Sequence, residues 1–109
     1  MLVVNRFVVD GDDADFRTRA GTALAALAAR PGYLRGRLGR AYDDPTAWTL
    51  VTEWESVGAY RRALSAYDVK VNATPLLAES LDEPSAFEEL AAAAPGGTVT
   101  IVPSDLAVP

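Results

Sequence analysis

Residues 2–9 limit the possible folds of this chain more than any other segment. Their sequence, Leu-Val-Val-Asn-Arg-Phe-Val-Val, is rich in β-branched residues, which is typical of a β-strand. Both faces of this strand are apolar: one carries Leu2, Val4 and Val8, and the other carries Val3, Phe7 and Val9. Such a strand has to be covered on both sides, because large exposed apolar patches are rare on monomeric proteins. The chain therefore needs a sheet with two covering layers.

A helix is predicted over residues 13–30. The turn at residues 10–13 supplies an Asp N-cap, and Asp15 adds negative charge to the first helical turn. Apolar residues then recur at steps of three and four; they are Phe16, Ala20, Ala23, Leu24, Leu27 and Ala28. Pro31-Gly32 ends this pattern, since Gly is common directly after a helix.

Two strands joined as a hairpin are predicted next. Residues 33–42 alternate in character, with Arg35, Arg37 and Gly39 on one face and Leu34, Gly36 and Leu38 on the other. Residues 43–46, Asp-Asp-Pro-Thr, are typical of a turn. Residues 48–54 form the partner strand, which carries Trp48, Leu50 and Trp54 on one face and Val51 on the other.

A second helix is predicted from Ser56, a suitable N-cap, to Thr74-Pro75, where proline stops it. Its apolar stripe consists of Val57, Tyr60, Leu64, Tyr67 and Val71. Residues 76–81 add a short helical turn. Residues 84–91 are consistent with a fourth strand, while the run at residues 88–94 fits a helix equally well.

The predicted order β-α-β-β-α-β is that of an α+β, ferredoxin-like fold, with a four-stranded antiparallel sheet and both helices on one face. The other face is apolar, and a second copy of the chain covers it best. We therefore expect a homodimer whose two sheets form a dimeric α+β barrel. We expect residues 1–92 to be the folded domain and residues 93–109 to be a C-terminal tail, either flexible or an arm that pairs with a partner's sheet edge.

The residue types that are missing exclude several functions. The 109 residues include no Cys and no His, which rules out disulfides, thiolate metal sites, serine-histidine triads and haem held by histidine. The net charge of −5 disfavours binding to nucleic acids. No segment is long and apolar enough to span a membrane, and residues 1–9 do not resemble a secretory signal, so we expect a cytoplasmic protein.

Three segments suggest a known family. They are Asn5-Arg6 in the first strand, Pro31-Gly32-Tyr33-Leu34 at the start of the second and Leu50-Val51-Thr52-Glu53-Trp54-Glu55-Ser56 at the end of the third. Over residues 1–91 the chain resembles the antibiotic biosynthesis monooxygenase (ABM) family. The resemblance implies a dimeric α+β barrel. The family includes cofactor-independent oxygenases of polycyclic phenols, haem-degrading enzymes and small regulators, so the fold alone does not define the chemistry.

The haem-degrading branch of this family uses an Asn in the first strand, a Trp in the second helix and an axial His near the end of that helix. Asn5 matches the first, whereas Ala63 and Asn72 stand at the positions of the Trp and the His. An amide is a poor iron ligand. The resemblance therefore disfavours haem degradation and leaves a haem-binding protein that lacks the axial His as an alternative.

The phenol-oxidising branch needs no metal, flavin or prosthetic group, so no cofactor is expected. In the mechanism that the resemblance implies, the substrate's own phenolate or carbanion reacts with oxygen inside a dry pocket. The predicted catalytic groups are Asn5, Tyr67 and Asn72, and the predicted binding surfaces for a small aromatic molecule are Phe7, Trp48, Trp54, Tyr60 and Leu64. We expect them to line an enclosed cavity between the sheet and the second helix.

Each of these residues also has a structural interpretation. The Asn5 amide can be satisfied by nearby backbone, and the aromatic residues can simply pack in the core or at a dimer interface. Arg35, Arg37 and Arg40 fit a solvated strand face, ion pairs across a dimer or a site for an anionic ligand. Beside the monooxygenase, the sequence leaves open a noncatalytic small-molecule-binding or regulatory barrel and a structural dimerisation module.

Overall fold

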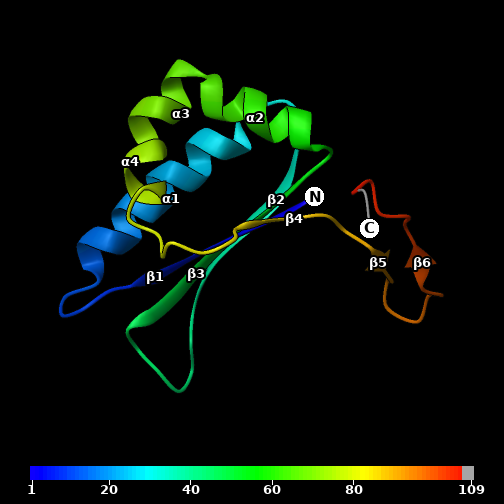
Figure 1. Ribbon diagram of the computed structural model, residues 1–109. Helices are drawn as coiled ribbons and strands as arrows, with labels where there is room; N and C mark the ends of the chain where they lie inside the picture. Colours follow the sequence, from blue (N-terminus) through cyan, green and yellow to red (C-terminus); the bar gives the residue numbers. More distant parts are fainter. Residues whose placement is uncertain (107–109) are drawn as a thin grey trace.

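The computed structural model describes residues 1–106 and contains a four-stranded antiparallel sheet with helices on one of its faces (Figure 1). The elements are β1 Leu2–Val8, α1 Ala14–Ala28, β2 Tyr33–Arg40, β3 Ala47–Trp54, α2 Val57–Ser65, α3 Tyr67–Asn72, α4 Thr74–Leu77, β4 Ala86–Phe87, β5 Ala91–Ala92 and β6 Thr100–Ile101. The strand order β2-β3-β1-β4 is that of a ferredoxin-like fold. The predicted α+β class is confirmed.

The core lies between the sheet and the helices. It contains Val3 and Phe7 of β1, Trp48, Leu50 and Trp54 of β3, Phe16, Ala20, Ala23, Ala26 and Leu27 of α1, Ala59 and Ala63 of α2, Val69 of α3, and Ala73 and Leu76 at α4. Side chains alternate across a strand, so these residues of β1 and β3 share the helix-facing side of the sheet. The many alanines leave little side-chain volume between helix and sheet, which allows close packing.

Short-range hydrogen bonds fix the ends of the first two helices. Ser56 caps α2 as predicted, because its Oγ accepts from the backbone N–H of Ala59 at 3.1 Å. Asp13 occupies the N-cap position of α1 without a side-chain cap. The carboxylate of Asp12 instead accepts from the N–H of Ala14 at 2.9 Å. After α1, Gly32 has a φ of +86° and turns the chain into β2.

The predicted second helix is broken at Ala66, whose backbone is extended with φ −70° and ψ 138°. Ala63 before the break is 1% exposed and Val69 after it is 0% exposed. In one unbroken helix these two residues would lie about 120° apart around the helix axis, so they would point in different directions and could not both be buried as deeply. The break turns α3 so that Val69 is buried while Tyr67 and Val71 become exposed. The prediction of a single apolar stripe is therefore wrong beyond Leu64.

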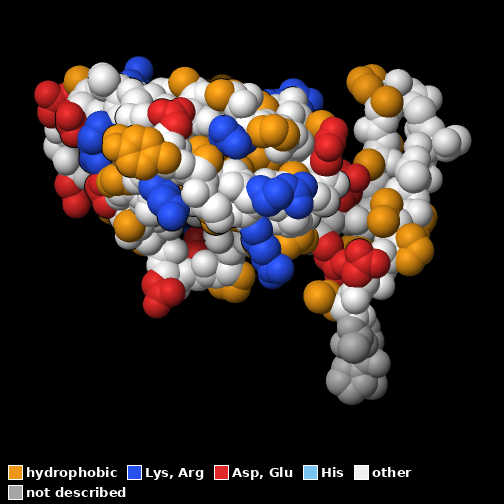
Figure 2. Space-filling view, turned by 90° about the horizontal axis from the view of Figure 1, so that it is seen from above, with side chains coloured by type: hydrophobic (Ala, Val, Ile, Leu, Met, Phe, Trp, Pro, Cys, Tyr) orange, Lys and Arg blue, Asp and Glu red, His pale blue; other side chains and the backbone are white. Residues whose placement is uncertain are grey.

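The C-terminal part departs further from the sequence-based expectation. β4 is only two residues long and pairs with Leu2 and Val3 of β1. The helix considered for residues 88–94 is not formed, because β5 pairs with β6 in a small separate hairpin. This C-terminal arm, residues 88–106, stands off from the main body (Figures 1 and 2). Residues 107–109, the end of the predicted tail, lie outside the described residues.

No helix covers the second side of the sheet, which we call the open face (Figure 1). Its apolar residues are Leu2, Val4 and Val8 of β1, Val51 of β3 and Phe87 of β4. Val8 is 58% exposed and Phe87 is 45% exposed. Arg35 and Arg37 of β2 border this apolar strip, in register with Glu53 and Val51. Among the described residues, no helix is long and apolar enough to cross a membrane.

Candidate functional site

Asn5 and Thr52 are the polar side chains buried in the core of the described chain. Asn5 lies opposite Leu50 in the register of β1 and β3, on the side that faces the helices. Thr52 is satisfied, because its Oγ1 accepts from Nε1 of Trp54 at 2.9 Å. Within residues 1–106, no hydrogen bond to the Asn5 side chain is found. Its amide is thus free to bind another molecule, and the structural alternative of a backbone-satisfied amide gains no support.

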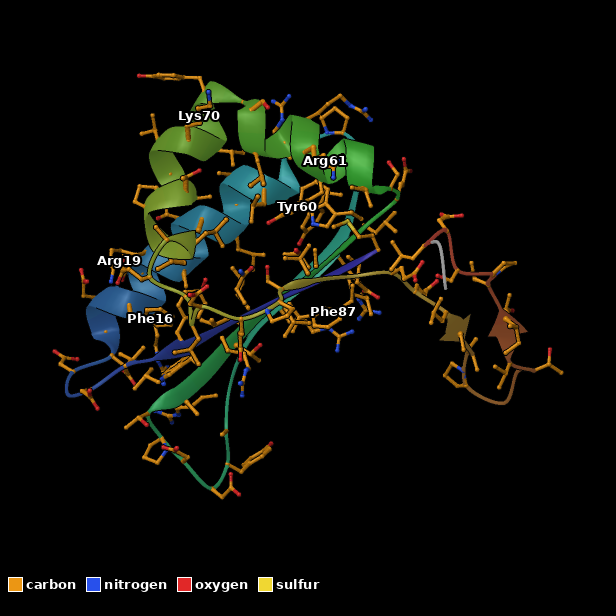
Figure 3. The ribbon with its side chains drawn as sticks, viewed as in Figure 1. Phe16, Arg19, Tyr60, Arg61, Lys70 and Phe87 are labelled. Atoms are coloured by element: carbon orange, nitrogen blue, oxygen red, sulfur yellow. The ribbon has the colours of Figure 1, made fainter. Side chains whose placement is uncertain are left out.

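An aromatic cluster lies at the β3 end near α2. The ring of Trp54 lies between Tyr33 and Tyr60, with centroid distances of 5.4 Å to each. Tyr60 reaches from α2 toward the sheet, whereas Lys70 lies on the outer side of the helices (Figure 3). Trp54 and Tyr60 were both predicted as binding surfaces, and the structure brings them together.

Burial raises the pKa of the Tyr60 hydroxyl. It also raises the pKa of the Tyr33 hydroxyl, which is less deeply buried. Both hydroxyls are therefore neutral at physiological pH and can donate hydrogen bonds. Gly36 makes room for one of them, because a Cβ at this position would lie 2.5 Å from the Tyr33 hydroxyl and 2.7 Å from Cδ1 of Leu24.

The raised pKa of Tyr60 predicts a loss of stability in alkali. Above the ordinary tyrosine pKa of 10.0, the unfolded chain releases this proton while the folded chain retains it, so the free energy of unfolding falls as pH rises. The Y60F variant removes the ionisable group and should show a shallower fall between pH 9 and 11 in urea titrations. An equal fall in Y60F and the parent chain would contradict the assignment of this effect to Tyr60.

A second aromatic cluster lies at the opposite end of β3. Phe16 makes edge-on contacts with Phe7 at 5.2 Å and with Trp48 at 5.4 Å between ring centroids. Trp48 pairs with Phe7 across the strands, and Asn5 is two residues along β1 from Phe7. The predicted binding residues are thus divided between two clusters, and Asn5 lies between them.

Two predicted catalytic residues are not part of this arrangement. Tyr67 is 82% exposed at the start of α3. The side-chain nitrogen of Asn72 donates to the carboxylate of Asp68 at 2.7 Å within the same helix. The break at Ala66 is the physical reason, because it rotates α3 away from the orientation that an unbroken helix would have. Leu64, before the break, does pack against the core.

The structure does not bring Asn5 and Tyr67 together around one cavity, because Tyr67 is exposed while Asn5 is buried. Among the described residues, five surface clefts have volumes of 190 to 700 Å³, and neither residue lines any of these five. Leu50 and Trp54 are each 1% exposed, so side chains fill the space between the sheet and α2. Asn5, on the same side of the sheet, is also buried, at 8% exposure.

Comparisons with known proteins agree with this fold. The sequence profile of the family described as antibiotic biosynthesis monooxygenase matches residues 1–71. A deoxynogalonate monooxygenase from Streptomyces nogalater is 33% identical over 97 residues, which cover 89% of this chain and 82% of that protein. The chain belongs to the antibiotic biosynthesis monooxygenase family. The family predicted from the sequence motifs is confirmed.

Solved structures place the chain among the same folds. The crystal structure of SnoaB, a cofactor-independent oxygenase from Streptomyces nogalater, matches with a TM-score of 0.66 at 33% identity. The matched region covers 82% of this chain and 94% of the SnoaB chain. A conserved protein from Methanosarcina mazei Go1 has a TM-score of 0.63 at 20% identity, with 78% of this chain and 84% of that chain covered. At 20% identity, the similarity to the Methanosarcina mazei protein concerns the fold alone.

The sequence-based prediction for this ABM protein missed Tyr33. A signal was present, since Tyr33 belongs to the Pro31-Gly32-Tyr33-Leu34 motif that suggested the family. Its register opposite Trp54 places it against a predicted binding residue. Tyr33 and Tyr60 offer neutral hydrogen-bond donors from residues on the two sides of the Trp54 ring.

Proposed function

We propose that this ABM protein is a cofactor-independent monooxygenase that acts on an aromatic, polyketide-like molecule. The observation that carries the proposal is the 33% identity to a deoxynogalonate monooxygenase over 89% of the chain. Asn5, Tyr33 and Tyr60 are the proposed orienting groups, and Trp54 is the proposed aromatic surface. The absence of His and Cys from the sequence is consistent with a reaction that uses neither as ligand or base.

The proposed reaction oxidises an activated methylene group of a polycyclic phenol to a ketone. It balances as R₂CH₂ + O₂ → R₂CO + H₂O, so the substrate supplies all of the electrons. Charge develops on the substrate when it loses a proton to form its phenolate or carbanion. Neutral donors in a water-free environment stabilise such charge more strongly than they would in water.

In this proposal the substrate enters by displacing α2, because core side chains occupy the space that it needs. Both ends of α2 suit such a movement, since Ser56 and Ala66 have extended backbones. The helix is anchored to the core by two small buried side chains, Ala59 and Ala63, and by the half-buried Tyr60. Tyr60 would then move with the helix, while Asn5 and Trp54 stay on the sheet.

Oxygen uptake with a panel of polycyclic phenols tests the proposal. We expect N5A to lower kcat by about 100-fold, the usual effect of removing one donor that stabilises developing charge. N72A is the matched control, because it removes the same amide from the surface of α3, and we expect its rate to stay within about twofold of the parent. Equal rates for N5A and the parent protein would exclude the proposed role of Asn5.

A noncatalytic small-molecule-binding or regulatory protein is the second candidate. The positions of Tyr67 and Asn72 favour it, since Tyr67 is exposed and Asn72 pairs with Asp68, so two predicted catalytic groups do not converge on Asn5. The same panel separates the two functions: binding of a phenol without oxygen consumption by the parent protein supports this alternative and overturns the monooxygenase.

We further propose that the protein forms a homodimer through the open face. The apolar strip formed by β1, Val51 and Phe87 has no cover within the described chain. The C-terminal arm also presents exposed apolar side chains, among them Leu90, Val99, Ile101 and Leu106. A partner's sheet offers both surfaces a place to pack.

A further inference from the structure

The β2–β3 hairpin extends beyond the helices (Figure 1). Residues of this hairpin and Arg17 of α1 line a surface cleft of about 700 Å³. Arg17, Arg40, Trp48, Tyr42 and Pro45 are among the residues that line it. Trp48 and Trp54 are six residues apart on β3, a separation of roughly 20 Å along a strand. The cleft is therefore distinct from the Tyr33–Trp54–Tyr60 cluster in which the oxygenase chemistry was proposed.

Two guanidinium groups converge on this cleft. The Cζ atoms of Arg17 and Arg40 lie 5.3 Å and 5.2 Å from the ring centroid of Trp48, within cation–π range. Both arginines pair with Asp13, at 3.4 Å and 2.9 Å respectively. Two cations thus share one carboxylate, and each guanidinium carries five N–H donors. Arg17, Arg40 and Asp13 together carry one net positive charge and leave N–H donors unused, although the chain as a whole has a net charge of −5.

Trp48 supplies an independent observation. This residue is 5% exposed, and its Nε1–H is buried with no hydrogen-bond partner in residues 1–106. The corresponding group of Trp54 donates to Thr52 at 2.9 Å. A buried donor without an acceptor is uncommon because it costs free energy. Because this N–H is closed off from solvent, a ligand in the cleft would reach it only after the side chains that cover it move.

We propose that this cleft binds a small aromatic carboxylate. The planar guanidinium groups of Arg17 and Arg40 match the geometry of a carboxylate, which competes with Asp13 for them. Tyr42 and Pro45 provide apolar surface for the flat ring. Binding at this site needs neither oxygen nor Asn5, so the proposal is independent of the proposed monooxygenase function.

Titration of the full chain, labelled with ¹⁵N, by 2-naphthoate tests the site. We expect the indole N–H signal of Trp48 to move and that of Trp54 to stay. The R17Q/R40Q variant should bind about tenfold more weakly. R35Q/R37Q removes the same charge from β2 on the open face and should bind within about twofold of the parent.

Replacement of Asp13 should increase the affinity of the cleft for 2-naphthoate. D13N removes the competing carboxylate and keeps a good N-cap residue, so it should bind 2-naphthoate about threefold more tightly or better. A purely structural role of the three charged residues would not produce this gain. Because D13N does not remove a guanidinium, it remains informative even if R17Q/R40Q fails to fold.

Four results would overturn the proposal. The first is no movement of the Trp48 signal at millimolar 2-naphthoate, and the second is that the neutral 2-naphthalenemethanol binds as tightly as 2-naphthoate. The third is that R35Q/R37Q weakens binding as much as R17Q/R40Q. The fourth is that folded D13N binds 2-naphthoate no more tightly than the parent chain. Inorganic phosphate is the last probe: if it binds as tightly as 2-naphthoate, the cleft is a general anion site and not one for an aromatic carboxylate.

Discussion

Replacement of Gly32 by alanine should lower the free energy of unfolding by about 3 kcal/mol. Gly32 has a φ of +86°, where a residue with a Cβ is strained. A Cβ at this position would also lie 2.4 Å from Cβ of Ala59, which has no flexible end that could move aside. The substitution therefore forces α2 away from the start of β2. Urea denaturation at one fixed protein concentration measures the loss.

G11A is the matched control for this experiment. Gly11 has a φ of +75°, but a Cβ there would meet nothing within 4 Å. G11A should therefore lose only the conformational part, about 1 kcal/mol. A similar loss in G11A and G32A would mean that α2 does not pack on Gly32 as described, and it would weaken the assignment of Tyr60 to the site.

The strands and the first helix could be predicted because their signals are local. The β-branched, apolar run of residues 2–9 and the spacing of Trp48, Leu50 and Trp54 mark the two central strands. Their pairing places Asn5 opposite Leu50. Trp54 and Tyr60, both named from the sequence as candidate binding surfaces, do lie together in one aromatic cluster. These features depend on local sequence patterns and on the fold class, and both can be inferred from the sequence.

The break at Ala66 could not be predicted from local signals. Alanine is the strongest helix former, and nothing around it marks an extended residue. The break is a tertiary effect, since it allows Ala63 and Val69 to be buried together. Tyr67 follows Ala63 by four residues, so an unbroken helix would have turned it toward the core, as the sequence analysis assumed. One backbone residue thus decides that the predicted hydroxyl lies on the surface.

The second large effect concerns the open face, where V51E should abolish the proposed homodimer. Val51 is half-buried and lies opposite Val4 on one side and Arg37 on the other. The introduced carboxylate faces Arg37 across the strands, so the single chain should keep its fold. In a symmetric dimer each substitution occurs twice, and taking two additional carboxylates out of water at the apolar interface should raise the monomer–dimer dissociation constant at least 100-fold, equivalent to about 3 kcal/mol.

Sedimentation of the two variants and the parent chain measures this effect. The parent should sediment with twice the chain mass of 11.6 kDa at micromolar concentration, and V51E with a single chain mass. V71E makes the same substitution on the exposed surface of α3 and should remain dimeric. A parent chain that is monomeric would exclude the dimer, and a dimeric V51E would place the interface on another surface. Because Asn5 and Val51 lie on opposite faces of the sheet, loss of oxygen uptake in folded V51E would show that activity depends on the partner subunit.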